Sequence, residues 1–177
     1  MDVVGVLLAA GAGHRYGSPK VLAHDGAWLH MAVTALAQGG CSSVLVVLGA
    51  ATPARLPDGV STVVAGDWAT GMGASLRAGL AAVASTPATH ALVHLVDTPD
   101  VGADVMARVL GTGAELARAA YDGAPGHPVL LARQHWAAVQ RSATGDHGAR
   151  DFLRSRDDVV LVECGDLATG RDHDLPD

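Results

Sequence analysis

A short, unbroken run of apolar residues near the start of the chain constrains its fold most strongly. Residues 3–9 contain no polar side chain, whereas a strand with one face in water alternates apolar and polar residues. A run of this length and composition predicts a strand buried on both faces. Such strands are typical of a parallel sheet covered by helices on both sides.

Segments typical of strands and helices alternate along the rest of the chain. Apolar runs predict further strands at 44–48, 59–65, 90–96, 116–121, 128–132 and 159–163. Apolar residues at helical spacing predict helices at 29–38, 72–84, 103–110, 133–141 and 147–154. The alternation predicts a three-layer α/β/α fold with a mostly parallel, Rossmann-like sheet. The chain has 177 residues and no long linker, so we expect a single domain, 1–177.

Charge and cysteine content narrow the class of protein. The net charge is −6 and no run of like charges occurs, so neither nucleic acid nor an anionic membrane surface is an expected partner. No apolar run approaches the ~18 residues of a membrane span, and no basic residues precede the first apolar run, so no secretion signal is expected. Cys41 and Cys164 cannot build a disulfide framework. We therefore expect a cytoplasmic protein.

The loop LLAAGAGHRYGSPK, residues 7–20, follows the first strand. Ligands of parallel sheets bind beyond the carboxyl ends of the strands, so this loop and those after Ala65 and Val96 are candidate sites. A P-loop is excluded because Lys20 lacks the preceding Gly and the following Ser or Thr. A dinucleotide loop is excluded because its glycine spacing is one residue too long, and because no acidic residue ends the second strand.

What remains is a glycine-rich loop that carries two cations. Glycines let backbone N–H groups approach phosphate oxygens closely, and Arg15 and Lys20 could bind the same phosphates. The residues alone leave another interpretation open, in which this is an ordinary strand-to-helix turn with both cations in solvent.

The loop and several later segments resemble one family. Leu8-Ala9-Ala10-Gly11, followed by Arg15, Gly17 and Lys20, is similar to the Leu-Ala-Ala-Gly-x-Gly/Ser-x-Arg-x-Gly-x-x-Lys signature of nucleotidyltransferases with a glycosyltransferase-A-like fold. Within the MobA-like NTP transferases, the resemblance is closest to the molybdenum cofactor cytidylyltransferase (MocA-like) branch. The later matching segments follow in order along the chain at 71–79, 96–101, 126–129, 145–150 and 172–177.

The resemblance implies Mg²⁺-dependent transfer of a nucleoside monophosphate to a phosphorylated acceptor, with release of pyrophosphate. It makes Asp97, directly after a predicted strand, a ligand of Mg²⁺, and Asp174 or Asp172 a second ligand. From the residues alone, Asp97 could instead cap a loop, and the C-terminal pair could lie in an exposed tail. Asp100 could be another ligand or could cap the next helix.

The same resemblance assigns the nucleotide site. The implied catalytic residues are Arg15, Lys20 and Asp97, with the two cations binding the triphosphate and stabilising the leaving pyrophosphate. The implied nucleotide-binding residues are Leu8, Ala9, Ala10, Gly11, Ala12, Gly13, Arg15, Lys20, Gly71 and Ser75. In this family Leu-Ala-Ala-Gly accompanies cytidine use, so the implied substrate is CTP.

The chain also departs from the family pattern. Gly73 and Ala74 stand where the branch has serines, which leaves Ser75 as the one hydroxyl for a base contact. Val96 replaces the glycine before Asp97. His173 and Leu175 replace an apolar residue and a threonine, which weakens the assignment of the second metal ligand.

The acceptor side is assigned by resemblance alone. His127, Asp146 and Arg150 would bind the acceptor, although Arg150 could instead pair with Asp146. The implied acceptor is a molybdopterin cofactor, with a molybdoenzyme or delivery protein as a possible partner. Two other functions stay open: an NAD(P)-dependent oxidoreductase of the nicotine-blue-reductase type, against which the missing ribose-binding acid counts, and a non-catalytic molybdenum-cofactor-binding protein.

A zinc site at His90 and His94 is not expected. The segment is predicted to be a strand, which would place the two residues ~13 Å apart on one face, too far for both to bind one tetrahedral ion. We expect both to pack within or upon the sheet.

Overall fold

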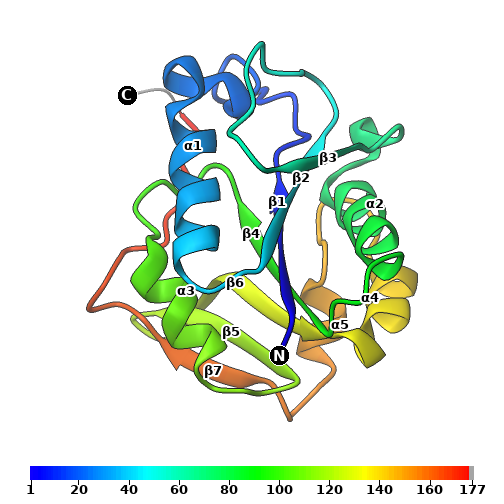
Figure 1. Cartoon of the computed structure of the whole chain (residues 1–177), viewed down its shortest axis with the longest axis vertical. Helices are drawn as coiled ribbons and strands as arrows, with labels where there is room; N and C mark the ends of the chain where they lie inside the picture. The colour runs from blue at the N-terminus through cyan, green and yellow to red at the C-terminus, as the bar shows by residue number, and fades with distance from the viewer. Residues whose placement is uncertain (176–177) are drawn as a thin grey trace.

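A mixed sheet forms the centre of the molecule in a computed structural model that describes residues 1–175 (Figure 1). Its strands are β1 (Val3–Leu8), β2 (Ser43–Leu48), β3 (Ser61–Val64), β4 (His90–Leu95), β5 (Leu116–Tyr121), β6 (Ala124–Ala132) and β7 (Val160–Glu163). They are ordered β3-β2-β1-β4-β6-β5-β7. Only β6 runs antiparallel to its neighbours, β4 and β5, among these strands, so the predicted mostly parallel sheet is confirmed.

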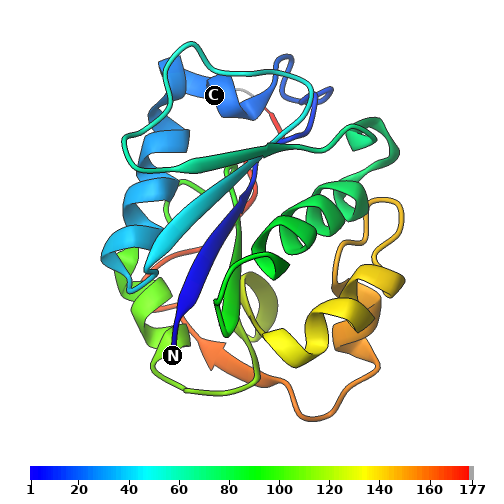
Figure 2. The ribbon, with the colours of Figure 1, turned by 45° about the vertical axis from the view of Figure 1, so that its right-hand side comes forward.

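Helices cover both faces of the sheet (Figure 2). On one face lie α1 (Ala23–Gln38) and α3 (Ala103–Leu110), and on the other lie α2 (Met72–Ala84), α4 (Trp136–Ser142) and α5 (Arg150–Arg154). Short 3₁₀ turns occupy Lys20–Leu22, Trp68–Thr70 and Arg133–His135. The predicted three-layer architecture is thereby confirmed. None of the helices in the described part of the chain is long and apolar enough to cross a membrane.

Three predicted helices differ from those observed. The helix expected at 133–141 opens with the 3₁₀ turn Arg133–His135, and α4 itself spans Trp136–Ser142. The helix expected at 147–154 begins only at Arg150, because Gly148 has a φ of 54°, outside the helical range. In α1, His24, Asp25 and Gly26 have φ values of 52°, 57° and 85°. Regular helix therefore begins after Gly26, closer to the predicted start at residue 29 than the bounds of α1 indicate.

The all-apolar composition of β1 follows from its place between two cores. Val3 and Leu7 pack with α1 and α3, whereas Val4, Val6 and Leu8 pack with α2 and α4. Successive side chains of a strand point to opposite faces, so both sets must be apolar. Every residue of β1 is buried.

A histidine lies inside this sheet. His94 in β4 is fully buried, its Nε2 lies 3.3 Å from Oγ1 of Thr98, and its Nδ1 has no hydrogen-bond partner. Burial, with a smaller effect from His127, lowers the pKa of His94 to about 3. The predicted strand at this segment and the packed position of His94 are confirmed.

The buried imidazole makes stability depend on pH. Because the pKa of His94 is lower in the folded chain than the ~6.5 of an unfolded histidine, its contribution is complete above pH 6.5 and is lost as pH falls toward 3. As the pH falls from 6 to 4, protonation that is possible only in the unfolded chain should lower the unfolding free energy by about 1.4 kcal/mol per pH unit. When the unfolding free energy is measured with urea at each pH, its change per pH unit should differ between wild type and His94→Gln by this amount. His30→Gln, at an exposed position of α1, should keep the wild-type slope; equal slopes for all three proteins would contradict the assignment.

Candidate active site

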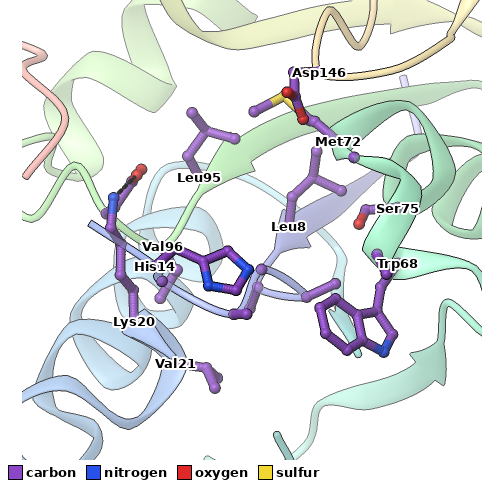
Figure 3. A pocket seen from close by; sticks show the side chains of 18 residues that line it. Leu8, His14, Lys20, Val21, Trp68, Met72, Ser75, Leu95, Val96 and Asp146 are labelled. Carbon is purple, nitrogen blue, oxygen red and sulfur yellow. Dashed lines mark hydrogen bonds and ion pairs between the residues drawn. The ribbon is translucent and has the colours of Figure 1, made fainter. Parts of the chain in front are cut away.

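A pocket of about 320 Å³ lies at the carboxyl ends of β1 and β4 (Figure 3). The loop after β1, the 3₁₀ turn at Trp68–Thr70, the start of α2 and the residues after β4 form its walls. The lining residues are Leu8, Ala9, Ala10, Gly11, Ala12, Gly13, His14, Lys20, Val21, Trp68, Ala69, Gly71, Met72, Ser75, Leu95, Val96, Asp97 and Asp146. The predicted nucleotide-binding residues other than Arg15 therefore share one cavity.

An ammonium between two carboxylates forms the charged end of this pocket. Nζ of Lys20 donates to Oδ2 of Asp97 at 2.7 Å and to Oδ1 of Asp174 at 2.8 Å. The side chains of Lys20 and Asp97 are only 14% and 17% exposed. Asp174 arrives with the C-terminal segment, which is attached where the backbone N–H of His173 donates to the carbonyl of Asp97 at 3.0 Å. Residues 20, 97 and 174 are thus joined in space.

The ion pairs set the protonation of these groups. Burial acts to lower the pKa of Lys20, but the hydrogen bonds and charges of Asp174 and Asp97 outweigh it and raise that pKa above its ordinary value. The hydrogen bond from Lys20 lowers the pKa of Asp174. Lys20 and Asp174 therefore carry opposite full charges at neutral pH.

The other predicted charged residues lie at the rim. Nη1 of Arg15 is 3.7 Å from Oδ2 of Asp174, and its side chain is 80% exposed. Burial, followed by the charges of Asp97 and Asp174, raises the pKa of Asp172. The prediction left open whether Asp172 or Asp174 accompanies Asp97, and in this structure it is Asp174 that contacts Lys20. Pro176 and Asp177, the end of the last family motif, lie outside the described residues.

One oxygen of Asp97 has no partner. Oδ1 is buried and accepts no hydrogen bond, although Oδ2 accepts from Lys20. An unpartnered buried carboxylate oxygen is costly, and a hard divalent cation would satisfy it. Within residues 1–175, no group of three or more His, Cys, Asp or Glu side chains could hold a metal by itself. The donor set fits an ion bound through one or two carboxylates and the substrate's own phosphates.

The opposite end of the pocket is mostly apolar. Trp68, Leu8 and Met72 line it, and Ser75 points into it from the first turns of α2 (Figure 3). Figure 3 shows Trp68 and Ser75 on the far side of the pocket from Lys20. One end of the cavity therefore suits a flat ring, and the other suits phosphates and a cation.

Close backbone approaches fix the loops around the pocket. Gly13 has a φ of 67°, and a Cβ there would lie 1.9 Å from the carbonyl oxygen of Ser18, so the loop can fold back only on a glycine. A Cβ on Gly73 would lie 2.9 Å from backbone atoms of Ala143 and Thr144. The N–H of Gly73 donates to the carbonyl of Gly145 at 2.8 Å. This packing explains why Gly73 replaces the serine of the family pattern.

The predicted acceptor residues lie apart from the charged end. Asp146 lines the pocket beside Met72 (Figure 3). His127, half-buried near the start of β6, and the exposed Arg150, at the start of α5, do not line it. Among the described residues, Arg150 and Asp146 form no ion pair, so the alternative that they pair finds no support here.

Asp100 does not cap α3, and the suggestion that it could is wrong. The cap position of α3 is Gly102, which has no side-chain capping bond. Oδ2 of Asp100 instead accepts from N and Oγ1 of Thr169, at 2.7 and 2.6 Å. Asp100 thereby holds the C-terminal segment that leads to Asp174.

Residues 71–75 were expected to form one wall of the base pocket, but other lining residues were not predicted from the sequence: His14, Val21, Trp68, Ala69 and Leu95. Trp68 had a usable signal, because it follows the predicted strand ending at Ala65, whose loop was among the candidate sites. Tryptophan is also scarce in this chain, which has three. Val21, Ala69 and Leu95 carry no chemistry that would distinguish them from core residues, whereas His14 lies within the glycine loop, between Gly13 and Arg15.

Comparisons with known proteins agree with this geometry. The family model of the MobA-like NTP transferase domain matches residues 5–159. The chain belongs to the MobA-like NTP transferase family. That range includes the glycine loop, Trp68, Ser75 and Asp97, so the predicted family is confirmed, whereas the MocA-like branch stays a prediction.

The relatives carry different names. The chain is 39% identical over 189 residues to nicotine blue oxidoreductase of Paenarthrobacter nicotinovorans, covering 97% of this chain and 92% of that protein. It is 29% identical to Rv0371c of Mycobacterium tuberculosis H37Rv, with a TM-score of 0.78 and coverage of 93% and 88%. A second structure of Rv0371c, 28% identical with a TM-score of 0.76 and coverage of 93% and 89%, is a complex with manganese.

A more distant structure shows the fold alone. It is a nucleotidyl transferase from Methanothermobacter thermautotroptrophicus, 17% identical with a TM-score of 0.75, and the similarity covers 92% of this chain and 87% of that one. The α/β nucleotidyltransferase fold predicted from the sequence is therefore confirmed.

The close packing at Gly73 gives a test of the site's architecture. Gly73→Ser should lower the free energy of unfolding by about 1–3 kcal/mol, because the added side chain must displace the backbone of residues 143–144. Gly66→Ser is the matched control, since nothing lies within 4 Å of a Cβ there, and it should change stability by less than ~0.5 kcal/mol. Urea unfolding measures both. A stable Gly73→Ser protein would show that the loop at 143–146 does not press on α2.

Proposed function

We propose that this protein is a divalent-metal-dependent nucleotidyltransferase that transfers CMP from CTP to a phosphorylated acceptor. The acceptor we propose is a molybdopterin cofactor. The observation that carries the proposal is the Lys20–Asp97–Asp174 cluster at one end of a cavity whose other end is apolar. An oxygen of the acceptor phosphate forms a bond to the α-phosphorus of CTP. The bond from that phosphorus to the bridging oxygen of the β-phosphate breaks, and pyrophosphate leaves.

In this proposal the cations of the glycine loop act on the triphosphate. Lys20 exchanges its contact with Asp97 and Asp174 for the phosphates, and Arg15 closes from the rim, where its fork suits a phosphate group. Both stabilise the charge that develops on pyrophosphate. Backbone N–H groups of residues 8–13 surround the nucleotide, which the close folding at Gly13 permits.

Asp97 and Asp174 would hold the metal. When bound, a Mg²⁺ or Mn²⁺ ion supplies positive charge that offsets the phosphates at the reacting centre. The unpartnered Oδ1 of Asp97 supports this assignment. The two carboxylates would also orient the nucleotide, because their positions determine where the negative charge of its phosphates can be neutralised.

The apolar end supports a base-binding role. Trp68 offers an aromatic face on which a base can stack, and Ser75 offers a hydroxyl beside Gly71 at the opening of α2. CTP is favoured by the resemblance of Leu8–Gly11 to cytidine-using members. The molybdopterin acceptor and a molybdoenzyme partner rest on the same resemblance.

Asp97→Asn tests the reaction. In an assay with CTP, Mg²⁺ and molybdopterin, loss of the charge at the reacting centre should lower the rate of pyrophosphate release by about 10²-fold or more. CTP should still quench tryptophan fluorescence through Trp68. Asp104→Asn, at the start of α3 and outside the pocket, should keep full activity. Turnover that persists in Asp97→Asn would refute the metal assignment, and wild-type protein inactive with all four triphosphates would refute the transferase.

A second function is supported by the 39% identical relative named nicotine blue oxidoreductase. Hydride transfer from a nicotinamide cofactor to a planar acceptor could use the same cavity. The end of β2 weighs against it, because Leu48 is followed by Gly49 and no carboxylate is available there for a ribose diol.

A binding comparison separates the functions. CTP with Mg²⁺ should raise the melting temperature and quench fluorescence, and Trp68→Phe should remove most of the quench. NADH and NADPH should do neither. Oxidation of NADH with a pigment acceptor would favour the oxidoreductase. Binding of a molybdenum cofactor without turnover of any triphosphate would favour the non-catalytic cofactor-binding function.

A further inference from the structure

A carboxylate without a protein partner borders the apolar end of the pocket. Asp146 lines the same cavity as Trp68 and Ser75. Figure 3 shows it beside Met72, on the side of the pocket away from Lys20. Among the described residues, its side chain forms no hydrogen bond or ion pair, and α2, whose start it approaches, has no side-chain capping bond. The carboxylate therefore has no structural partner and is available to a ligand.

The start of α2 sets the position of this carboxylate. Gly71 has a φ of 120°, and a Cβ there would lie 2.6 Å from Oδ1 of Asp146 and 2.5 Å from the carbonyl oxygen of Gly145. Only a glycine lets the loop approach so closely. The N–H of Gly73 donates to that same carbonyl at 2.8 Å. Backbone contacts thus hold Asp146 over the first turn of α2.

Asp146 and the reacting phosphates belong to different parts of the cavity. In the proposed reaction the acceptor attacks the α-phosphorus beside Lys20 and Asp97, whereas Asp146 lies with Met72 at the start of α2. A carboxylate also repels the phosphate of an acceptor, so its charge suits the uncharged base better. The resemblance implied an acceptor-binding role for Asp146, but its place in the cavity favours the nucleoside.

The two pyrimidine bases present opposite polarity to such a carboxylate. Cytosine carries an amino group at position 4, which donates hydrogen bonds, whereas uracil carries a carbonyl oxygen there, which accepts them. An ionised carboxylate accepts hydrogen bonds and donates none. It therefore stabilises the amino group of cytosine and repels the oxygen of uracil.

The other groups at this end do not distinguish the two bases in the same way. The side chain of Ser75 points into the pocket (Figure 3), but a hydroxyl both donates and accepts, so it fits either base. Stacking on Trp68 is equally tolerant, because every base has a π-face. Selection between cytosine and uracil by these side chains therefore falls to Asp146.

We infer that the Asp146 carboxylate accepts a hydrogen bond from the amino group of cytosine, and that this contact selects CTP over UTP. The inference rests on the proposed function for the identity of the ligand as a nucleoside triphosphate. It assigns a choice of base to the loop at 143–146, in addition to residues 8–11, on which the resemblance based it. A hydrogen bond to a charged group should favour CTP by about tenfold or more.

Fluorescence titration with CTP and with UTP, each with Mg²⁺, tests the contact without requiring turnover. Wild type should bind CTP about tenfold or more tightly than UTP. Asp146→Asn should bind the two almost equally, because its amide can accept from cytosine or, when rotated, donate to uracil. Asp146→Ala should bind CTP more weakly than wild type and lose the preference. Asp157→Asn removes an exposed carboxylate outside the pocket and should keep the wild-type preference.

The outcomes separate this contact from a structural role and from acceptor binding. Because Asp146 is exposed and bonds to no other side chain, its variants should keep the wild-type melting temperature. Equal binding of CTP and UTP by wild type, or an unchanged preference in Asp146→Asn, would overturn the contact. A raised KM for the acceptor in Asp146→Asn, with the preference for CTP intact, would also overturn it and restore the acceptor role.

The same titrations separate the contact from the proposed function. A preference for CTP that depends on Asp146, in a protein that releases no pyrophosphate, would support the contact and refute the transferase. Pyrophosphate release with equal use of CTP and UTP would refute the contact and leave the transferase in place. Binding of neither nucleotide to wild type would overturn both.

Discussion

The contact between Lys20 and two carboxylates is the interaction on which the arrangement of the site depends. It joins the glycine loop, the end of β4 and the C-terminal segment, which are separated by 77 and 154 positions in sequence. Lys20 and Asp97 are largely withdrawn from solvent, and a buried ion pair that loses one partner leaves a costly unpaired charge. The positive charge of Lys20 is therefore balanced before any substrate arrives, and an incoming triphosphate must come with a compensating cation.

The polarity of the cavity follows from the topology of the sheet. β1 and β4 are adjacent and parallel, so the loops that leave them meet at one edge. The loop after β1 is rich in glycine and exposes backbone N–H groups, whereas Asp97 lies two residues beyond the end of β4 at Leu95. The turn after β3 adds Trp68 from the opposite side. The charged end thus comes from the segments after β1 and β4, and the aromatic ring at the apolar end comes from the turn after β3.

Most of the fold could be predicted from the sequence, because strand and helix periodicity is local. The run at residues 3–9 and the helix ending before Gly39 need no knowledge of distant residues. The late start of α5 depends on a positive φ at Gly148, and the antiparallel direction of β6 depends on pairing between distant strands. Neither is visible in a hydrophobic pattern.

The candidate site was predictable to a similar degree and for a similar reason. Lys20, Asp97 and Ser75 stand in motifs whose spacing can be compared directly. Asp100 was misinterpreted because its partner, Thr169, lies 69 positions away.

The reversed direction of β6 divides the molecule into two halves that can change separately. β3, β2, β1 and β4 carry the glycine loop, Trp68 and Asp97, while β6, β5 and β7 carry His127 and Arg118. β6 is hydrogen-bonded to β4, so the two halves share one sheet, but the glycine loop and Asp97 both belong to the first. Side chains of the second half can therefore differ among proteins of this fold while the cavity at the ends of β1 and β4 is kept, which offers a structural reason why relatives of similar fold bear names for unlike reactions.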